Sequence, residues 1–259
     1  MLSGILYPSA GEATILGHTP WERKEEYKMQ IAMVMGQKSQ LWWDLPAIET
    51  FRLNQDIYEI PENKFQANLK KLSDLLETNE FLHTPVRKLS LGQRMKCELI
   101  AALLHDPKVL FLDEPTIGLD VNSQRKMREF LKTYNHEHQA TIILTSHYMD
   151  DIKSLCQRVI IIDKGQKIYD GEYDQLINNY AREKLIEIST LKNFHKNDLE
   201  KYGEIMEFEN NKALIKIPRE HASRITRELV QNLEIEDILV KELEASDVVA
   251  DLFAQNHRI

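Results

Sequence analysis

The sequence predicts an α/β fold for the first two thirds of the chain and a small α+β domain for the rest. Short apolar runs with strand character alternate with longer helical segments up to about residue 178, which is typical of a parallel sheet covered by helices. One run, Val109–Leu112, is apolar at every position and ends in the acidic pair Asp113 and Glu114. An unbroken apolar run of this kind is typical of a strand buried on both faces.

The composition fits a folded protein of one large or two ordinary domains. The chain has 259 residues, of which 42% are hydrophobic. No segment approaches the roughly 20 apolar residues that a bilayer-spanning helix needs, and no secretory leader is visible. The formal net charge of −8 disfavours wrapping of nucleic acid. The two cysteines, Cys97 and Cys156, lack metal-ligand spacing, which favours a reducing cytosol.

The first residues have the pattern of a helix end and a turn, and short strands are predicted after them. Met1–Leu6 resembles the end of a helix, and Tyr7–Gly11 has the composition of a turn. Short strands are predicted at Glu12–Leu16 and Ile31–Met35.

Residues 45–106 are predicted to form a mostly helical subdomain. Two sets of apolar residues recur at helical spacing and define two buried helix faces. They are Phe65, Leu69, Leu72 and Leu76 in the first set, and Met95, Leu99 and Leu103 in the second. The second helix is expected to end before Asp106-Pro107, because a proline disfavours helical geometry in the residue before it.

Further elements complete the first predicted domain, which spans residues 1–178. Val121–Tyr134 is predicted to be a charged helix, and Thr141–Thr145 a second buried strand. Arg158–Ile162 and Gln166–Tyr169 flank Asp163-Lys164-Gly165, whose turn chemistry predicts a β-hairpin.

Residues 179–259 are predicted to form a separate accessory domain of α+β type. The strand candidates are Leu185–Ser189, Ile205–Phe208, Ala213–Ile217 and Ile235–Val240, with Asn210-Asn211 as a turn. Helices are predicted at Asn197–Tyr202, Glu220–Leu233 and Ser246–Phe253. This domain carries no recognisable catalytic pattern, so its role is left open.

The acidic pair after Val109–Leu112 is the first candidate for a functional site. Buried carboxylates are costly unless they are paired or bound to metal, so Asp113 and Glu114 are expected at the carboxyl end of the strand, where α/β folds bind ligands. An Asp there can hold Mg²⁺ on a nucleotide, and a neighbouring Glu can polarise a water molecule. Two solvated acids at a strand end are the alternative interpretation.

The segment Leu89–Gln93 opens the helix that precedes this strand. Ser90 can cap that helix, whose free N–H groups and positive dipole end suit an anion. Gly92 would let a phosphate approach the backbone closely. Taken alone, the segment is also compatible with an ordinary helix start.

Together, these segments resemble the nucleotide-binding subunit of ABC transporters over residues 1 to about 178. The motifs occur in the family's order and at its usual separations. Leu89–Gln93 resembles the signature loop, Val109–Asp113 the Walker B strand, Glu114 the catalytic carboxylate, Gly118-Leu119-Asp120 the D-loop, His147 the switch histidine and Gln37 the Q-loop glutamine. Trp42, Trp43 and Leu45 most resemble the ABC-2-type exporter branch, which carries a carboxyl-terminal extension of about this size.

The resemblance implies an ABC-type ATPase that uses ATP and Mg²⁺. Asp113 would hold the Mg²⁺ ion, with Gln37 as a further contact to metal or water. Glu114 would align or deprotonate the attacking water, and His147 would contact the γ-phosphate.

The resemblance also implies that two chains share each ATP. In the family, the residues matching Ser90, Gly92 and Gln93 bind the γ-phosphate of ATP held by the opposite subunit, so that ATP is sandwiched between two chains. Asp120 is assigned to the same nucleotide-binding set.

Two departures from the family pattern bear on ATP binding. Leu91 stands where the signature usually has Gly, and a Leu tolerates helical geometry but not a positive φ. The Walker A loop, Gly-x-x-x-x-Gly-Lys-Ser/Thr, does not occur in the sequence. Because Met1–Leu6 resembles the end of the helix after that loop, the chain is expected to be truncated and to bind ATP weakly alone. The missing neighbouring strand is expected to expose edges such as Val109–Leu112.

These observations predict an ATP-binding subunit that couples ATP binding and hydrolysis to export. The expected partners are a membrane-spanning permease and a second ATP-binding subunit, identical or different, with no nucleic acid. The expected location is cytoplasmic, at the inner face of the cell membrane. A soluble ABC-type ATPase acting in translation or on DNA is one alternative, and a degenerate regulatory remnant is another. No pattern in the sequence indicates the transported substrate.

Overall fold

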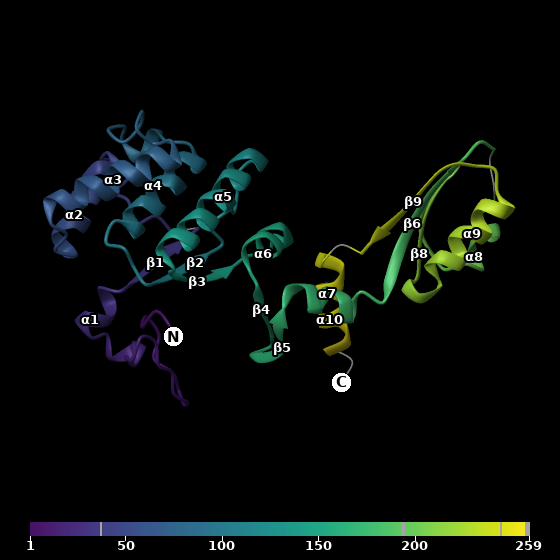
Figure 1. The fold of residues 1–259 in the computed structure, drawn as a ribbon, viewed down its shortest axis with the longest axis horizontal. Helices are drawn as coiled ribbons and strands as arrows, with labels where there is room; N and C mark the ends of the chain where they lie inside the picture. Colours follow the sequence, from purple (N-terminus) through teal and green to yellow (C-terminus); the bar gives the residue numbers. More distant parts are fainter. Residues whose placement is uncertain (37, 193–194, 244, 257–259) are drawn as a thin grey trace. The chain divides into compact units, whose positions relative to one another are not determined.

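The chain divides into two compact units, residues 1–155 and 156–259 (Figure 1). The computed structural model describes residues 1–36, 38–192, 195–243 and 245–256. The contacts therefore place the hairpin that follows residue 155 in the second unit. The domain boundary expected near residue 178 stays a prediction.

The first unit contains a parallel sheet of three strands, β1 (Ile31–Met35), β2 (Val109–Asp113) and β3 (Thr141–Thr145), in the order β1-β2-β3. These are the strands predicted at the same residues. The register aligns Met35, Asp113 and Thr145, so the carboxyl ends of all three strands lie at one edge. The sheet thus brings together segments that are far apart in the sequence.

Two predictions about this sheet were wrong. β2 is the central strand and its residues 109–112 are buried between two neighbours, so Val109–Leu112 does not form an open edge. Within the described residues, β1 and β3 are the strands of this sheet that pair on one side only. β3 was predicted to be buried, but its side chains are exposed or half-buried, and Ile143 is 39% exposed. An apolar run reports strand character but not the number of layers that cover the strand.

The predicted helical subdomain consists of α2 (Ala47–Ile57), α3 (Glu62–Leu76) and α4 (Leu91–Leu103), with a short 3₁₀ turn at Val86–Lys88. Figure 1 shows the three helices gathered beside the β1-β2-β3 sheet. Both predicted helix faces are confirmed, because all seven of their apolar residues are buried in one core with β2. Asp106, with φ 55°, lies in the turn between α4 and β2.

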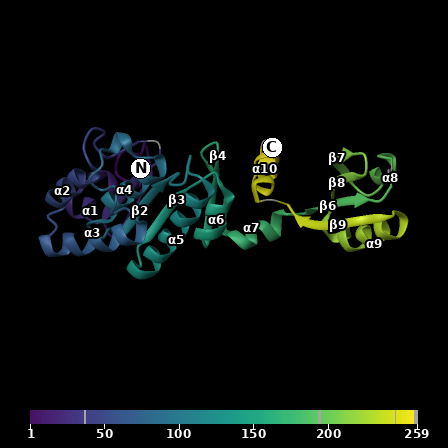
Figure 2. The same cartoon turned by 90° about the horizontal axis from the view of Figure 1, so that it is seen from above.

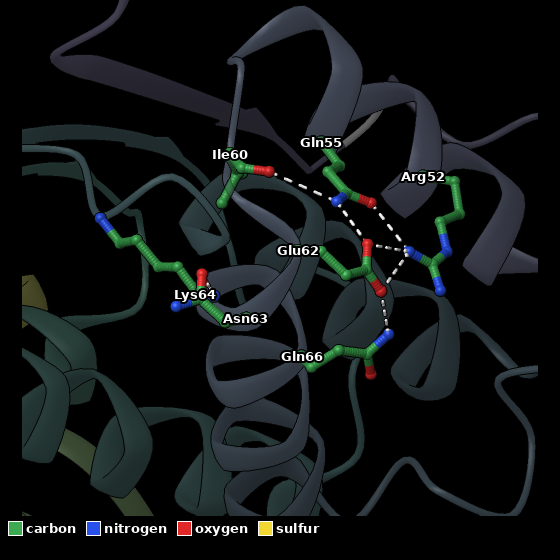
Figure 3. Close-up of polar contacts among 7 residues, drawn as sticks. All are labelled: Arg52, Gln55, Ile60, Glu62, Asn63, Lys64 and Gln66. Atoms are coloured by element: carbon green, nitrogen blue, oxygen red, sulfur yellow. Dashed lines mark hydrogen bonds and ion pairs between the residues drawn. The ribbon is translucent and has the colours of Figure 1, made fainter.

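A polar cluster on the surface joins α2 to the first turn of α3 (Figure 3). Glu62 accepts hydrogen bonds from Gln66, Gln55 and Arg52 at 2.7, 2.7 and 2.9 Å. These bonds, that of Gln66 foremost, lower the pKa of Glu62 to about 2. Gln55 Nε2 also donates to the Ile60 carbonyl at 3.3 Å, so the cluster is bonded to the turn between the two helices.

The first 30 residues differ from the prediction. Met1–Leu6 forms a turn closed by the Gly4 N–H and the Met1 carbonyl, not the end of a helix. The described residues 12–16 do not form the predicted strand. A single bridge pairs Ile15 with His18 instead. Short helical pieces follow at Pro20–Glu22 and α1 (Glu25–Lys28).

Two helices complete the first unit. α5 (Val121–His138) is the predicted charged helix, four residues longer than expected, and α6 (Met149–Leu155) follows β3. α5 buries Met127, Phe130, Leu131 and Tyr134 in the same core as the helical subdomain.

The second unit begins with the predicted hairpin, β4 (Arg158–Asp163) and β5 (Gln166–Glu172). Its turn residues, Lys164 and Gly165, have φ of 46° and 78°, as a two-residue type I′ turn requires. α7 (Tyr173–Tyr180) and α10 (Ala245–Asn256) pack with the hairpin through Ile161, Leu176 and Leu252.

The rest of the second unit is an antiparallel sheet with helices beside it (Figure 2). Its strands, in the order β7-β8-β6-β9, are β6 (Glu183–Thr190), β7 (Glu204–Glu209), β8 (Lys212–Pro218) and β9 (Ile235–Glu242). The helices are α8 (Asn197–Glu200) and α9 (Ala222–Asn232), which share a core with β6 and β8. All predicted elements of this region are confirmed. Among the described residues, we find no helix that combines the length and the apolar character needed to cross a bilayer.

Candidate functional site

The carboxyl ends of β2 and β3 meet at the edge where Asp113 leaves the core. The four residues before Asp113 are buried, whereas its own side chain is exposed. Thr145, its partner in register on β3, donates a hydrogen bond from Oγ1 to Asp113 Oδ1 at 2.6 Å. Asp113 is therefore an exposed carboxylate fixed at the end of the sheet through one of its oxygens, and carboxylate oxygens are ligands for Mg²⁺.

Glu114 and His147 form a direct pair at the same edge. His147 Nδ1 lies 2.8 Å from Glu114 Oε2, and the His147 backbone N–H points to the same oxygen at 3.4 Å. The Glu114 backbone N–H donates to the Thr145 carbonyl at 3.0 Å, which fixes the base of the carboxylate. Since Nδ1 is occupied by Glu114, the Nε2 atom of His147 is left for a ligand.

The backbone of Glu114 is strained. Its φ of 51° lies in the left-handed region, and Pro115 follows it, although a residue before proline prefers extended geometry. Such conformations cost about 1–3 kcal/mol and cluster at functional sites. The strain turns the chain sharply out of β2 and presents the Glu114 side chain beside the end of β3.

The loop after β1 lies against this turn. The Gly36 N–H donates to the Asp113 carbonyl at 2.7 Å, and a Cβ at Gly36 would lie 2.3 Å from the Glu114 carbonyl oxygen. Only glycine fits there. Gln37, expected to contact metal or water, falls outside the described residues, and its role stays a prediction.

Ser90, Gly92 and Gln93 form the first turn of α4. Ser90 and Gln93 make a reciprocal capping box, with the Gln93 N–H donating to Ser90 Oγ at 3.2 Å and the Ser90 N–H to Gln93 Oε1 at 2.9 Å. The predicted helix cap is confirmed. Leu91 is helical, so the Leu that replaces the usual Gly of the signature causes no backbone strain.

This turn packs against the segment Gly118-Leu119-Asp120. Leu91 Cδ2 would lie 2.7 Å from a Cβ at Gly118, whose φ is 70°. Asp120 caps α5 by accepting from the Asn122 and Ser123 N–H groups at 3.0 Å and from Ser123 Oγ at 2.6 Å. These bonds, that of Ser123 Oγ foremost, lower the pKa of Asp120.

The predicted site residues thus form two groups. Asp113, Glu114 and His147 lie at the end of the sheet, whereas Ser90–Gln93 and Gly118–Asp120 lie together at the starts of α4 and α5. Within the described residues, no hydrogen bond joins one group to the other. The segment Pro115–Ile117 runs between them along the chain.

A buried network behind the site was not predicted from the sequence. Asp151 on α6 is fully buried and accepts hydrogen bonds from Thr116 Oγ1 at 2.5 Å and Ser146 Oγ at 2.8 Å. Arg128 on α5 lies 2.8 Å from its other oxygen. Asp151 therefore links the turn after Glu114 with the residue before His147. The adjacent acids Asp150 and Asp151 look alike in the sequence, and only the fold shows which one is buried.

The residues at the sheet end fit a nucleotide-bound Mg²⁺ ion. Mg²⁺ keeps several waters and takes only one or two protein carboxylates when substrate phosphates supply the other ligands. Asp113 provides one such carboxylate. Among the described residues there is no group of three or more acidic, His or Cys side chains that would form a complete protein cage for a metal.

The chain resembles known proteins in both units. A family model described as ABC transporter matches residues 1–117, and one described as EvrA-like ABC transporter, C-terminal domain, matches residues 182–241. The ABC transporter ATP-binding protein NatA of Bacillus subtilis is 31% identical over 185 residues, which cover 71% of this chain and 75% of NatA.

Two further similarities are more partial. The Nod factor export ATP-binding protein I of Cupriavidus metallidurans is 30% identical over 179 residues, 69% of this chain but 58% of that protein. A solved ATP binding subunit of an ABC transporter has a TM-score of 0.62 at 23% identity, covering 69% of this chain and 74% of that one, and so shares the fold. On the similarity to NatA, the chain belongs to the ATP-binding proteins of ABC transporters, a family that hydrolyses ATP with Mg²⁺.

Proposed function

We propose that the chain is the ATP-binding subunit of an exporter, in which ATP binding and hydrolysis drive transport through a membrane-spanning permease. The pair His147 Nδ1 and Glu114 Oε2, 2.8 Å apart at the end of β2, carries the proposal. The names of two relatives, an ABC transporter ATP-binding protein and a Nod factor export protein, support the same reading.

Each residue at the sheet end has a chemical task in this proposal. Asp113 would hold the Mg²⁺ ion, which neutralises phosphate charge. Glu114 would orient and deprotonate the attacking water. His147, anchored to Glu114 through Nδ1, would direct Nε2 to the γ-phosphate. Gln37 would add a contact to metal or water.

The second group would serve a second subunit. In the proposed dimer, Ser90, Gly92, Gln93 and Asp120 would contact the ATP held by the partner. The capping box fixes this turn by pairing the Ser90 and Gln93 N–H groups, and it leaves the Leu91 and Gly92 N–H groups outside the box. Such groups at a helix start suit a phosphate. The bonds that Asp120 accepts from the first turn of α5 would hold its carboxylate in position for this contact.

The 259 residues contain no Walker A motif, so we propose that a polypeptide of these residues binds Mg-ATP weakly by itself. Isothermal titration should detect no binding in the micromolar range. A micromolar dissociation constant for Mg-ATP would contradict this part of the proposal.

A composite site can be tested separately, because the signature half is present. An intact ABC subunit that carries Walker A but has an inactive signature serine should regain ATPase activity when mixed with this chain. The S90A variant should not restore it. Equal restoration by wild type and S90A, or by neither, would count against the composite site.

The permease is expected to contact an exposed apolar surface formed by Trp42, Trp43 and Leu45. Their side chains are 51%, 54% and 38% exposed, in the segment that leads from the β1 loop into α2. Exposed aromatic clusters mark interaction sites. This contact would hold the chain at the inner face of the membrane.

Co-purification from detergent-solubilised membranes tests the whole proposal. The tagged chain should capture a multi-span membrane protein, identified by mass spectrometry, and the W42A/W43A variant should capture much less. W21A is the matched control, since Trp21 lies in another segment, against Tyr7. Capture of ribosomal proteins instead would favour the soluble alternative.

A further inference from the structure

Glu98 is a buried carboxylate that the proposed catalysis does not use. It lies in the middle of α4 and is 3% exposed. A buried charge is costly unless hydrogen bonds compensate it. Among the described residues, its hydrogen-bond donors come from residues 39–41 of the loop after β1, which are 57 to 59 positions away in the sequence.

The contacts of Glu98 hold that loop at three consecutive residues. Ser39 Oγ donates to Oε1 at 2.5 Å, the Gln40 N–H lies 3.0 and 3.1 Å from the two oxygens, and the Leu41 N–H lies 3.5 Å from Oε1. The Leu41 side chain is buried in the core of the first unit. Burial raises the pKa of Glu98, although the bonds from Ser39, Gln40 and Leu41 oppose this.

The loop continues directly into the exposed tryptophans, and α4 contacts it a second time there. Arg94, one turn before Glu98 on α4, places its guanidinium 5.8 Å from the centre of the Trp43 ring. Two side chains of α4, four residues apart, therefore hold the segment from Ser39 to Trp43 on one face of the helix.

The same loop is also bonded to the residues just before Ser90. The Arg87 N–H donates to the Trp43 carbonyl at 2.9 Å, and the Val86 N–H donates to the Leu45 carbonyl at 3.0 Å. Leu89 and the capped Ser90 turn follow at once. The tryptophan surface is thus connected to the start of α4 through the backbone and to its middle through Glu98.

We propose that Glu98 is a positioning residue that locks the loop of residues 39–45 onto α4, so that the tryptophan surface and the Ser90–Gln93 turn move as one body. A partner that displaces the tryptophans would then displace the turn proposed to contact phosphate. The proposal rests on the roles proposed above for both surfaces, but the mechanical link can be tested without ATP or permease.

Hydrogen exchange of single backbone amides in the full chain measures this link. In the E98A variant, the Gln40 amide loses its acceptor and should exchange about tenfold faster or more, as expected for loss of a hydrogen bond to a charged group. The Leu41 amide loses the weaker of its two acceptors and keeps Ser39 Oγ at 3.2 Å, so its exchange should speed up less. The effect should spread to the Arg87 and Gln93 amides, which mark the connection to the Ser90 turn. E98Q keeps one acceptor oxygen and should stay closer to wild type than E98A.

L72A is the control for general destabilisation, because Leu72 on α3 is buried in the same core and has no hydrogen bond to the loop. L72A should not speed exchange at the amides of Gln40, Leu41, Arg87 and Gln93 more than at other amides of the first unit. If E98A does not fold, S39A, which leaves the core intact, should speed exchange at Gln40, whose acceptor Glu98 loses its bond from Ser39 Oγ. Leu41 is not used for this variant, because its own N–H donates to Ser39 Oγ at 3.2 Å. Unchanged exchange at Gln40 and Leu41, or a change there that does not reach Arg87 and Gln93, would overturn the proposal. Neither result depends on whether the chain serves an exporter.

Discussion

At the scale of single residues, the site depends on a close contact between the backbones of Gly36 and Glu114, which the types of side chain in the site do not reveal. Glu114 adopts a left-handed conformation before a proline, and Gly36 lies directly against its carbonyl. Contacts from the surrounding structure, including the hydrogen bond from the Gly36 N–H to the Asp113 carbonyl, keep this strained turn in its conformation. The position of Glu114 therefore depends on the lack of a side chain at Gly36.

A Gly36→Ala substitution should destabilise the first unit by about 1–3 kcal/mol, because the added Cβ would lie 2.3 Å from a carbonyl oxygen. Urea unfolding followed by tryptophan fluorescence reports on this unit, since Trp21, Trp42 and Trp43 all lie within it.

Gly92→Ala is the matched control for this measurement. Its added Cβ would come no closer than 3.4 Å to Ser123 Oγ, and alanine is favoured over glycine in a helix by up to about 1 kcal/mol. The prediction fails if the two variants are equally stable.

At the scale of elements, α5, α6 and the two loops of the site are joined by one buried carboxylate. Asp151 receives bonds from the segment after β2, from the segment after β3 and from α5. Residues that connect three elements can set the distance between Glu114 and His147 without touching a substrate. The helix and strand positions themselves were largely predicted, because they follow from local periodicity.

Asp151→Ala should cost about 3–5 kcal/mol, because it leaves the guanidinium of Arg128, which is 15% exposed, without its partner. Asp150→Ala, at an exposed neighbouring acid, should change stability by less than about 0.5 kcal/mol. Denaturant midpoints for the two variants make the comparison. Similar values would show that the buried network contributes little.

At the scale of the whole molecule, two carboxylates make the stability of the first unit depend on pH in opposite directions. Exposed Glu62 has a pKa of about 2, lowered first by Gln66, so its contribution is present above the ordinary value of 4.5 and is lost as the pH falls. Burial raises the pKa of Glu98 above the same ordinary value. Its stabilising contribution is therefore present below 4.5 and is lost as the pH rises through the raised pKa.

The variants E98Q and E62Q should consequently show opposite trends with pH. As the pH rises above 4.5, E98Q should gain stability relative to wild type, because it removes a buried charge. E62Q should be less stable than wild type above pH 4.5, and this difference should disappear as the pH falls from 4.5 to about 2, where wild type loses the contribution of ionised Glu62. The difference should be small, since solvent screens exposed pairs. Unfolding followed by tryptophan fluorescence at a series of pH values measures both trends. If the stabilities of E98Q and wild type change with pH in parallel, the raised pKa of Glu98 is refuted.

Tertiary structure determined most of what the local pattern left open. Whether β3 is buried depends on which elements cover it, and the order β1-β2-β3 places it at the edge in the described chain. The turn at Met1–Leu6 is held by Arg23 and Tyr27, whose contacts span 18 residues or more. No local periodicity carries such information, so the predicted helix end and the strand at Glu12–Leu16 were wrong.

The sequence by itself determined where most strands and helices after residue 30 lie, that Asp113 and Glu114 stand at a strand end, and that Ser90 caps a helix. Each of these depends on residues within a few positions of one another, where periodicity, turn chemistry and capping act. Only the tertiary structure decided that Glu114 pairs with His147, that Asp151 rather than Asp150 is buried, and that Glu98 holds the loop before Trp42. These contacts join residues about 30 to 60 positions apart. Their energies depend on burial and on distance, which exist only once the chain has folded.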